Sequence, residues 1–349
     1  MRIAIAADLH LTAKEDHPER YNSLENILSQ LETQGSRTLL IAGDLFDKDF
    51  HNYSEFERLC KKYPQIQIHI IPGNHDPNIN TKSIVAPNIH VYTSPTAVEF
   101  GSTTFFFIPY KEKTKMGEQI AASVGSIRDK EWVLVSHGDY YGGVKERNPL
   151  EPGTYMPLSK ENVDIFKPRA AFLGHIHKPH NRDKVYYPGS PCGLDITETG
   201  KRKFLIYDTD NNSVDWVGVS TDIIYFDETF VIVPSEDEVP ILQNEVRKRI
   251  KSWNLEPAEE TKVVVRVQAI GYATDRSAIL SVLKEGFNKF RYYDGEPSIE
   301  DLSVNPDQQL KAVAERTMKL IDKLDWNFGG DEPEKEDVKL AVLNLIYGD

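Results

Sequence analysis

The chain has 349 residues, an ordinary globular composition and a formal net charge of −13. This acidic balance argues against nucleic-acid binding through a basic surface, but it is compatible with a cleft that is locally positive or is made positive by bound metal ions. The two cysteines, Cys60 and Cys192, lie far apart and indicate no disulfide framework, which is typical of a reducing compartment. No apolar run reaches the length of a membrane span, so we expect a cytoplasmic protein without membrane contact.

Short apolar runs alternate with helical patterns over the first 180 residues. Helices are expected at 19–34, where Leu24, Ile27, Leu28 and Leu31 share one face, and at 55–62. Alternating strands and helices predict a largely parallel sheet with helical crossovers. The expected strands cover residues 3–7, 38–42, 68–71, 89–92, 103–108, 132–136 and 170–173.

Polar residues follow five of these strands at the point where each one ends. Taken singly, each cluster is compatible with an ordinary turn. Ligands of parallel sheets gather outside the carboxyl ends of the strands, so we expect the five clusters to meet there. Their members are Asp8 and His10, then Asp44, then Asn74, His75 and Asp76, then His137, and finally His175 and His177.

The side chains in these clusters offer oxygen and imidazole ligands but no thiolate. Such ligands suit a hard or borderline divalent cation such as Mn²⁺ better than a structural zinc–thiolate site. There are more ligands than one ion needs, and Asp44 lies between the two groups in sequence, where it could bridge two ions. Paired ions about 3.5–4 Å apart are common machinery for in-line attack on phosphorus.

The rest of the chain predicts a change of architecture near residue 222. A strand at 204–208 closes the first domain, 1–222, and two strand–helix pairs follow, their helices starting at Asp237 and Asp275. Residues 292–304 are rich in acidic and turn residues and predict a linker. Within the first domain, the loop 140–160 is long enough to line a site. The basic loop 111–115 is either a solvated surface or a phosphate contact.

Two amphipathic helices are expected at the C-terminal end, in a segment 301–349 that follows a small α+β domain, 223–300. The first would begin at Asn305-Pro306 and the second would cover 335–347. Their apolar stripes have two interpretations: packing on the chain's own core, or docking of a partner's helices.

Five blocks of this sequence resemble the signature of the calcineurin-like metallophosphoesterases. The blocks are Asp8-Leu9-His10, Gly43-Asp44-Leu45-Phe46-Asp47, Gly73-Asn74-His75-Asp76, His137-Gly138-Asp139 and Gly174-His175-Ile176-His177. The resemblance implies an α/β fold in which a β-sandwich is flanked by helices.

The resemblance also implies two divalent cations, Mn²⁺ or alternatively Mg²⁺, and a role for each residue. One ion would be held by Asp8, His10, Asp44 and His177, and the other by Asp44, Asn74, His137 and His175. His75 would donate a proton to the leaving oxygen, and Asp76 would orient it.

Within this superfamily the chain is similar to the SbcD-type DNA-repair nucleases of the meiotic-recombination-eleven family. The similarity rests on Tyr155-Met156-Pro157-Leu158-Ser159, on Tyr187-Pro188-Gly189-Ser190-Pro191, and on the added α+β unit and terminal helices. It implies exonuclease and single-strand endonuclease activity on DNA ends. It also implies a capping domain at 223–300 that selects DNA, helices in 301–349 that dock on the coiled coils of an SMC-like ATPase, and a homodimer.

Two other functions are compatible with the same motifs, and one residue departs from the family pattern. A different phosphodiesterase or phosphatase of the superfamily would share the site, whereas a non-catalytic scaffold is disfavoured because such proteins usually lose ligands. Many family members carry His where Asp47 stands, so the side chain that supports His75 is open.

Overall fold

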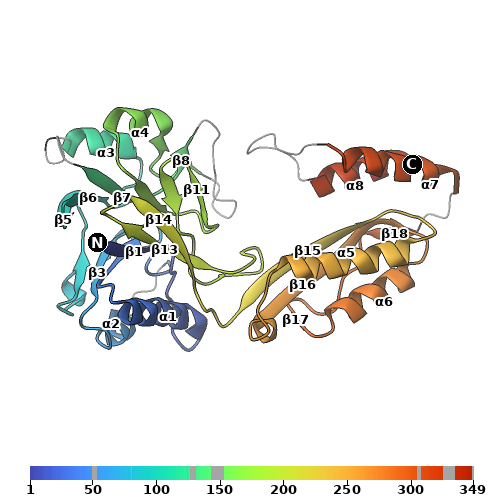
Figure 1. Cartoon of the computed structure of the whole chain (residues 1–349), viewed down its shortest axis with the longest axis horizontal. Helices are drawn as coiled ribbons and strands as arrows, with labels where there is room; N and C mark the ends of the chain where they lie inside the picture. The colour runs from blue at the N-terminus through green and yellow to red at the C-terminus, as the bar shows by residue number, and fades with distance from the viewer. Residues whose placement is uncertain are drawn as a thin grey trace. The chain divides into compact units, whose positions relative to one another are not determined.

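A computed structural model of the chain describes residues 1–48, 53–79, 81–123, 125, 131–142, 153–304, 308–324 and 335–347. It divides into two compact units (Figure 1). The first comprises Met1–Leu194 and Lys201–Asp222, and the second comprises Asp195–Gly200 and Ile223–Asp349. Among the described helices, none combines the length and apolar character needed to cross a bilayer.

Two six-stranded sheets form the centre of the first unit. The first sheet has the order β14 (Ser213–Gly218), β13 (Lys203–Asp208), β1 (Arg2–Ala6), β2 (Thr38–Ala42), β3 (Gln67–Ile71) and β4 (Ile89–Val91). The second has the order β11 (His180–Arg182), β12 (Val185–Tyr187), β10 (Ala171–Gly174), β7 (Trp132–His137), β6 (Thr103–Ile108) and β5 (Thr96–Phe100). The predicted strands are therefore present, and their division between two sheets confirms the β-sandwich that the family resemblance implies.

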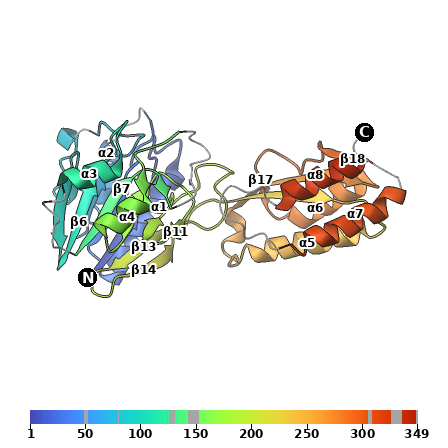
Figure 2. The same cartoon turned by 90° about the horizontal axis from the view of Figure 1, so that it is seen from above.

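Apolar alternation along the strands explains why the two sheets stack. In β1, Ile3 and Ile5 point into a core between the sheets, whereas Ala4 and Ala6 face the helices α1 (Pro18–Gln34) and α2 (Tyr53–Cys60). Helices α3 (Met116–Ser123) and α4 (Lys160–Phe166) cover the outer face of the second sheet. Figure 1 shows the resulting helix–sheet–sheet–helix layering, and Figure 2 looks onto α3 and α4 from above.

Helix α1 shows how the sequence pattern becomes packing. Its four predicted core residues, Leu24, Ile27, Leu28 and Leu31, are all fully buried. The helix ends at Gly35, which has a φ of 69° and whose N–H caps the carbonyl of Glu32. The prediction of a helix at 19–34 is confirmed within one residue.

Three parallel strands of each sheet carry the expected crossovers. Strand β1 pairs with β2 and β2 with β3 in parallel, and β6 pairs with β7 and β7 with β10 in parallel. Their carboxyl ends consequently lie at one end of each sheet. The long segment 140–160 contributes a short parallel ladder between β8 (Tyr140–Tyr141) and β9 (Leu158–Ser159), while residues 143–152 lie outside the described residues.

The second unit contains a four-stranded parallel sheet. Strand β15 (Ile224–Ile232) pairs with the central β16 (Val263–Ala273), and β17 (Arg291–Tyr292) and β18 (Leu302–Val304) both pair with β16. Helices α5 (Glu238–Ser252) and α6 (Arg276–Phe287) bury one face, with Phe230, Leu242 and Leu283 in the shared core.

The segment 292–304 was expected to be a linker, and this prediction is wrong. Leu302 is 1% exposed and pairs with Gly271, and Ser298 forms a bridge with Gln268. The acidic and turn residues occupy the connection between β17 and β18, whereas the burial of Leu302 holds the last strand in the sheet.

The C-terminal helices α7 (Gln308–Ile321) and α8 (Lys335–Tyr347) pack on the other face of this sheet. Ala314, Met318, Leu343 and Tyr347 are buried against a sheet surface that includes Val231. Packing on the chain's own core is therefore observed for one side of each helix. The predicted helix start at Asn305-Pro306 lies outside the described residues.

A buried histidine in the first sheet makes stability depend on pH. His69 on β3 is 6% exposed, its Nδ1 lies 2.7 Å from the hydroxyl of Tyr92, and its ring stacks on His90 at 4.7 Å. Burial, with a smaller contribution from His90, lowers the pKa of His69 from its ordinary 6.5 to about 4. Between these two values the unfolded chain binds a proton that the folded chain excludes, so acid favours unfolding.

We therefore expect the free energy of unfolding to fall by about 2 kcal/mol between pH 7 and pH 5 from His69 alone. His69→Gln retains a polar side chain but does not titrate, so it should flatten the pH dependence by that amount. Urea titrations of both proteins at several pH values, with metal chelated, provide the measurement. Parallel curves for the two proteins would contradict the assignment.

Candidate metal centre

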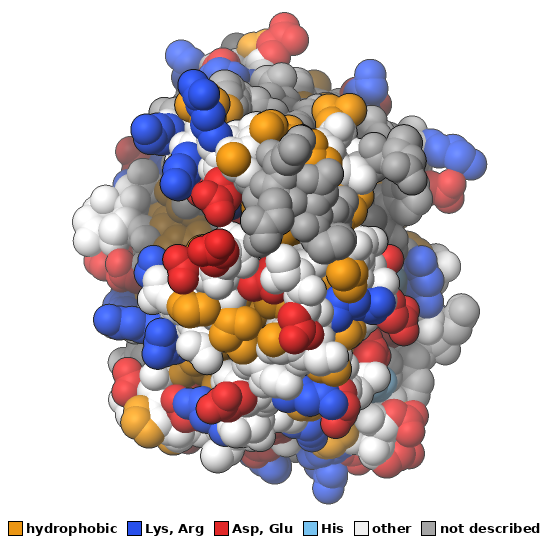
Figure 3. All heavy atoms as spheres, turned by 90° about the vertical axis from the view of Figure 1, so that its right-hand side faces the viewer, with side chains coloured by type: hydrophobic (Ala, Val, Ile, Leu, Met, Phe, Trp, Pro, Cys, Tyr) orange, Lys and Arg blue, Asp and Glu red, His pale blue; other side chains and the backbone are white. Residues whose placement is uncertain are grey.

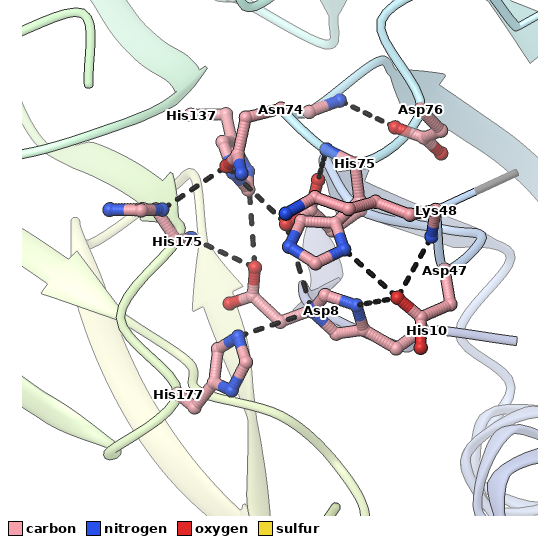
Figure 4. Close-up of polar contacts among 12 residues, drawn as sticks. Asp8, His10, Asp47, Lys48, Asn74, His75, Asp76, His137, His175 and His177 are labelled. Carbon is pink, nitrogen blue, oxygen red and sulfur yellow. Dashed lines mark hydrogen bonds and ion pairs between the residues drawn. The ribbon is translucent and has the colours of Figure 1, made fainter. Parts of the chain in front are cut away.

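The carboxyl ends of five strands bring the predicted ligands together (Figure 4). Asp8 and His10 follow β1, Asp44 follows β2, Asn74 and His75 follow β3, His137 ends β7, and His175 and His177 follow β10. All but Asn74, His75 and His177 are at most 1% exposed. Two sheets thus contribute polar side chains to one buried cluster.

One half of the cluster is formed by Asp8, His10 and His177, whose potential ligand atoms lie within 4.8 Å of one another. The Nε2 atoms of His10 and His177 are 3.1 Å apart. Asp44 Oδ2 lies 3.7 Å from His10 Nε2. This half corresponds to the first predicted ligand set.

The other half is formed by Asn74, His137 and His175 around the same Asp44. Asn74 Oδ1 lies 2.8 Å from His137 Nε2 and 3.1 Å from His175 Nδ1. Asp44 Oδ2 lies 3.3 Å from His137 Nε2. One carboxylate oxygen of Asp44 therefore faces both halves of the cluster.

Both buried carboxylates use one oxygen for a backbone N–H and present the other to the cluster. Asp8 Oδ1 accepts from the N–H of His175 at 2.8 Å, and Asp44 Oδ1 accepts from the N–H of His75 at 2.9 Å. Asp8 Oδ2 is buried and has no hydrogen-bond partner among the described residues. An unsatisfied buried carboxylate oxygen is costly unless a cation or donor meets it.

The tautomer of His137 also fits a bound cation. Its Nδ1–H donates to the carbonyl of Ala42 at 2.9 Å, which is the usual outer support of a metal-binding imidazole. Its Nε2 then faces two oxygens. Ligand atoms bound at about 2.1 Å to one ion are themselves about 3 Å apart, which matches the spacings in both halves of the cluster. The residues present thus fit two divalent cations.

Burial and neighbouring charges shift the pKa values of three residues in the cluster. Burial alone would lower the pKa of His137, but Asp44 and Asp8 raise it to about 9. For Asp44, burial acts to raise the pKa, and His137 and His10 outweigh it and lower the pKa below the ordinary range. Burial raises the pKa of Asp8. A cation that replaces the imidazolium proton would satisfy the same carboxylates.

Comparison with known proteins agrees with this geometry. The model of one protein family, described as calcineurin-like phosphoesterase, matches residues 1–207. The chain belongs to the calcineurin-like phosphoesterases. Members of this family use divalent metal ions, and the chain is accordingly a metal-dependent phosphoesterase.

A curated relative and several solved structures are similar to this phosphoesterase. Exonuclease subunit 1 of Enterobacteria phage T4 is 28% identical over 245 residues, which cover 63% of this chain and 68% of that protein. An archaeal phosphodiesterase matches with 14% identity and a TM-score of 0.35, covering 63% of this chain and all of the other. A dimetal phosphatase from Danio rerio matches with 12% identity and a TM-score of 0.40, covering 63% of this chain and 96% of the other.

The backbone of the phosphoesterase site is held in an unusual conformation. Asp8, His10, Asp44 and His175 all have positive φ, at 54°, 45°, 49° and 99°. Such residues cost of the order of 1–3 kcal/mol each and persist only where their surroundings determine them. The Asp8 N–H donates to Gly43 at 3.1 Å and the His10 N–H donates to Asp44 at 3.0 Å, so each strand end supports the next.

Three glycines make room for the ligands. A Cβ on Gly43 would lie 2.2 Å from the His137 ring, and one on Gly174 would lie 2.1 Å from the carbonyl of Ala42. A Cβ on Gly73 would lie 2.1 Å from Asp44 Oδ1. The Gly-Asp, Gly-Asn and Gly-His pairs of the sequence are therefore close approaches of backbone to ligand as well as turns.

The support of His75 differs from the prediction. Asp47, and not Asp76, provides the carboxylate at the His75 ring: His75 Nδ1 lies 2.9 Å from Asp47 Oδ1. The Asp76 carboxylate instead accepts from the backbone N–H groups of Gly73 at 2.7 Å and Phe46 at 3.1 Å. Burial, with the charge of Asp44, raises the pKa of Asp76 to about 7. Asp76 thus shapes the turn that carries His75. Asp47, in place of the predicted Asp76, contacts the His75 ring.

Asp47 is itself held in its ionised form. Burial opposes ionisation, but the imidazoles of His10 and His75 lower the pKa of Asp47 well below the ordinary range. Arg20 Nη1 adds a contact at 3.4 Å to the second oxygen of Asp47. An ionised Asp47 accepts from the Nδ1–H of His75, and this fixes which ring nitrogen is left for chemistry.

Two buried arginines, Arg20 and Arg202, lie behind the site, and sequence reasoning missed both. Arg20 Nη1 donates to the carbonyl of His10 at 2.5 Å. The Arg202 guanidinium donates to the carbonyl of His177, and to Ser190 Oγ at 2.6 Å. They hold the backbone of two histidines whose Nε2 atoms face each other. Neither lies in a recognised motif, so composition and spacing carried no signal for them.

The contact of Gly73 with Asp44 yields a prediction about metal binding. Gly73→Ala places a methyl group against Asp44 Oδ1 and the Asp44 backbone nitrogen, and Asp44 must move away from both halves of the cluster. We expect the metal affinity to fall by about tenfold or more.

Metal content by mass spectrometry and titration calorimetry with Mn²⁺ measure this effect. Gly218→Ala is the matched control, because a Cβ there meets no atom within 4 Å. Equal Mn²⁺ affinity in both variants would show that Asp44 does not belong to the metal site.

Proposed function

We propose that this phosphoesterase is a two-metal DNA nuclease with exonuclease and single-strand endonuclease activity. The observation that carries the proposal is the position of Asp44 Oδ2, 3.7 Å from His10 Nε2 and 3.3 Å from His137 Nε2. A carboxylate shared by two ligand groups is the arrangement that a pair of neighbouring ions requires.

Each ion would have its own ligands in addition to Asp44. Asp8, His10 and His177 would hold one ion, and Asn74, His137 and His175 would hold the other. Four imidazoles with three oxygen-bearing side chains favour Mn²⁺ over Mg²⁺, because Mg²⁺ prefers oxygen ligands and water. When bound, the ions would polarise the phosphate and lower the pKa of a coordinated water.

The protein's own contribution to catalysis centres on His75. The Nδ1–H of His75 is committed to Asp47, so Nε2 is the atom that can hold a proton for the leaving oxygen of the substrate. The hydrogen bond to Asp47 also fixes the orientation of the His75 ring. Asp47 also lies 3.6 Å from His10 Nδ1, which couples the proton donor to a metal ligand.

One observation favours DNA over other phosphodiesters, and a second argues against a protein without catalytic activity. The curated relative from phage T4 carries the name exonuclease subunit 1. The retained site residues argue against a non-catalytic scaffold, since the cluster contains every predicted ligand. A phosphatase or a small-molecule diesterase of the same family remains the alternative that an experiment must separate.

We expect Mn²⁺ to support hydrolysis of an end-labelled DNA duplex and a single-stranded oligonucleotide with a higher kcat/KM than bis(p-nitrophenyl) phosphate. His75→Ala should lower turnover of DNA by about 10²–10⁴-fold while metal content stays unchanged, because a general acid is lost. Asp47→Asn should also lower the turnover of DNA. Combining Asp47→Asn with His75→Ala should lower turnover little beyond His75→Ala alone, because the two residues act as one unit.

Asp227→Asn is a matched carboxylate control, because Asp227 lies on β15 in the second unit and pairs with Arg266. Hydrolysis of the small diester alone would refute the nuclease function. Full DNA hydrolysis by His75→Ala would refute the proton-donor role.

We propose further functions for the second unit. Residues 223–300 would act as a capping domain that selects DNA, and residues 301–349 would dock an SMC-like coiled-coil ATPase, with the whole acting as a homodimer. The word subunit in the phage relative's name supports a partner. Val313 and Leu320 on α7 and Leu324 just beyond it are 51–58% exposed, and Leu345 on α8 is 84% exposed. Figure 3, which views the second unit end-on, shows exposed apolar side chains among charged ones.

Point substitutions test this docking better than removal of the helices, because removal would uncover Val231 and Tyr272 on the sheet. We expect Leu320→Glu with Leu324→Glu to weaken ATPase binding by about tenfold or more, since burying a charge in an apolar interface is unfavourable. Pull-down and calorimetry with the purified partner measure this effect.

Val85→Glu, at a residue of the first unit that is 73% exposed, controls for added charge. Unchanged partner binding by the double variant would exclude α7 as the docking surface. Light scattering of the free protein tests the homodimer.

A further inference from the structure

A cavity of about 480 Å³ lies next to the metal cluster and carries chemistry that the cluster itself does not use. Asn74 belongs to both. The other walls include Lys48, Asn78, Tyr110, Lys111 and Tyr155. We propose that this cavity binds one unpaired nucleotide of a DNA strand, adjacent to the phosphate that is cleaved. This proposal rests on the proposed nuclease function and specifies its substrate as a strand with an unstacked base.

Two tyrosine rings form the aromatic part of the cavity. The Tyr155 ring lies 4.5 Å from the His175 ring, the Tyr110 ring lies 6.2 Å from the His137 ring, and the two tyrosine rings are 6.3 Å apart between centroids. Each ring thus stands beside a predicted ligand of the second ion. A base that stacks here would place its own phosphate close to that ion.

Hydrogen bonds hold the backbone of both tyrosines in place. Tyr155 exchanges two hydrogen bonds with Asp139: its N–H donates to Asp139 Oδ2 at 2.7 Å, and its carbonyl accepts from the Asp139 N–H at 2.8 Å. The Tyr110 N–H donates to the carbonyl of Pro72 at 3.1 Å. Rigid aromatic surfaces bind bases without regard to sequence, because every base has a π face.

Two lysines give the cavity a positive edge in a protein of net charge −13. The exposed Lys111 side chain forms no ion pair with any residue in the described part of the chain, and the one acidic residue of the cavity wall, Glu112, pairs with Lys113 at 3.2 Å. Figure 4 shows the Lys48 side chain directed toward the ligand cluster. Lysine ammonium groups at this edge suit the phosphates on either side of a bound base.

The combination selects an unpaired nucleotide rather than a duplex. Inside a duplex both faces of a base are covered by its neighbours, so its ring cannot reach a tyrosine. Single strands, frayed ends and flaps expose such faces. The cavity therefore predicts that the enzyme acts faster where the base next to the cleaved bond is unpaired.

The test compares a single-stranded oligonucleotide with the same oligonucleotide carrying an abasic residue next to the cleaved bond. For the wild type, the abasic residue should lower kcat/KM by about 5–150-fold, mostly through KM, because stacking on the ring is lost. Tyr110→Leu should cause a similar loss with the normal strand and should show little further loss with the abasic strand. Metal content and thermal melting of the variant show whether the site beneath Tyr110 is intact.

A matched pair of lysine variants tests the positive edge. Lys111→Gln should weaken oligonucleotide binding and reduce the slope of log affinity against log salt by about 1, whereas Lys113→Gln in the same loop should change both less. Binding is measured by fluorescence anisotropy in EDTA, so that it does not depend on hydrolysis.

The outcomes separate this proposal from the nuclease function. Suppose that the wild type cleaves DNA. If the abasic residue and Tyr110→Leu then leave kcat/KM unchanged, or if Tyr110→Leu lowers kcat/KM equally for the normal and the abasic strand, the subsite is refuted and the nuclease function stands. If no DNA is cleaved but binding in EDTA depends on Tyr110, Lys111 and the base, the subsite stands and the nuclease function is refuted. Equal effects of Lys111→Gln and Lys113→Gln would refute the phosphate contact.

Discussion

The structure depends on two carboxylates, Asp8 and Asp44, that are buried where the two sheets meet. A buried carboxylate is unfavourable unless charge and hydrogen bonds compensate it. Each uses one oxygen for a backbone N–H and directs the other to the imidazoles and to the position of a cation. Four of the site residues, Asp8, His10, Asp44 and His175, turn into the cluster with a left-handed backbone, and the surrounding hydrogen bonds hold them in it. The same buried carboxylates therefore affect both metal binding and the local stability of the site.

The strands and the polar residues at their ends could be predicted because both depend on local sequence. Apolar runs of five residues followed by Gly and Asp specify a strand and the turn that ends it. The division into two sheets could not be predicted in this way, since strand pairing depends on contacts between distant residues. The segment 292–304 shows the reverse error: its composition is that of a loop, but the burial of Leu302 decides its structure.

The support of His75 shows where reasoning from neighbouring residues fails. Asp76 follows His75 in sequence, yet the turn at Gly73 folds its carboxylate back onto backbone N–H groups. Asp47 lies 28 residues away and reaches the ring through the fold. Arg20 and Arg202 belong to the same class, because their carbonyl contacts to His10 and His177 join segments that no motif connects. The sequence thus indicates which side chains enter the site, and tertiary structure decides which of them support one another.

The position of β13 in the first sheet has a consequence for how the protein is synthesised. Strand β1 pairs with β13 in register from Arg2–Asp208 to Ile5–Leu205, about 200 residues later in the chain. All five motif blocks precede this partner strand in the chain, so β1 has an open edge until β13 has been synthesised. Contacts between such distant segments slow folding and leave strand edges available to other chains. The sheet that carries Asp8, Asp44 and Asn74 is thus completed by a late strand that contributes none of the predicted ligands.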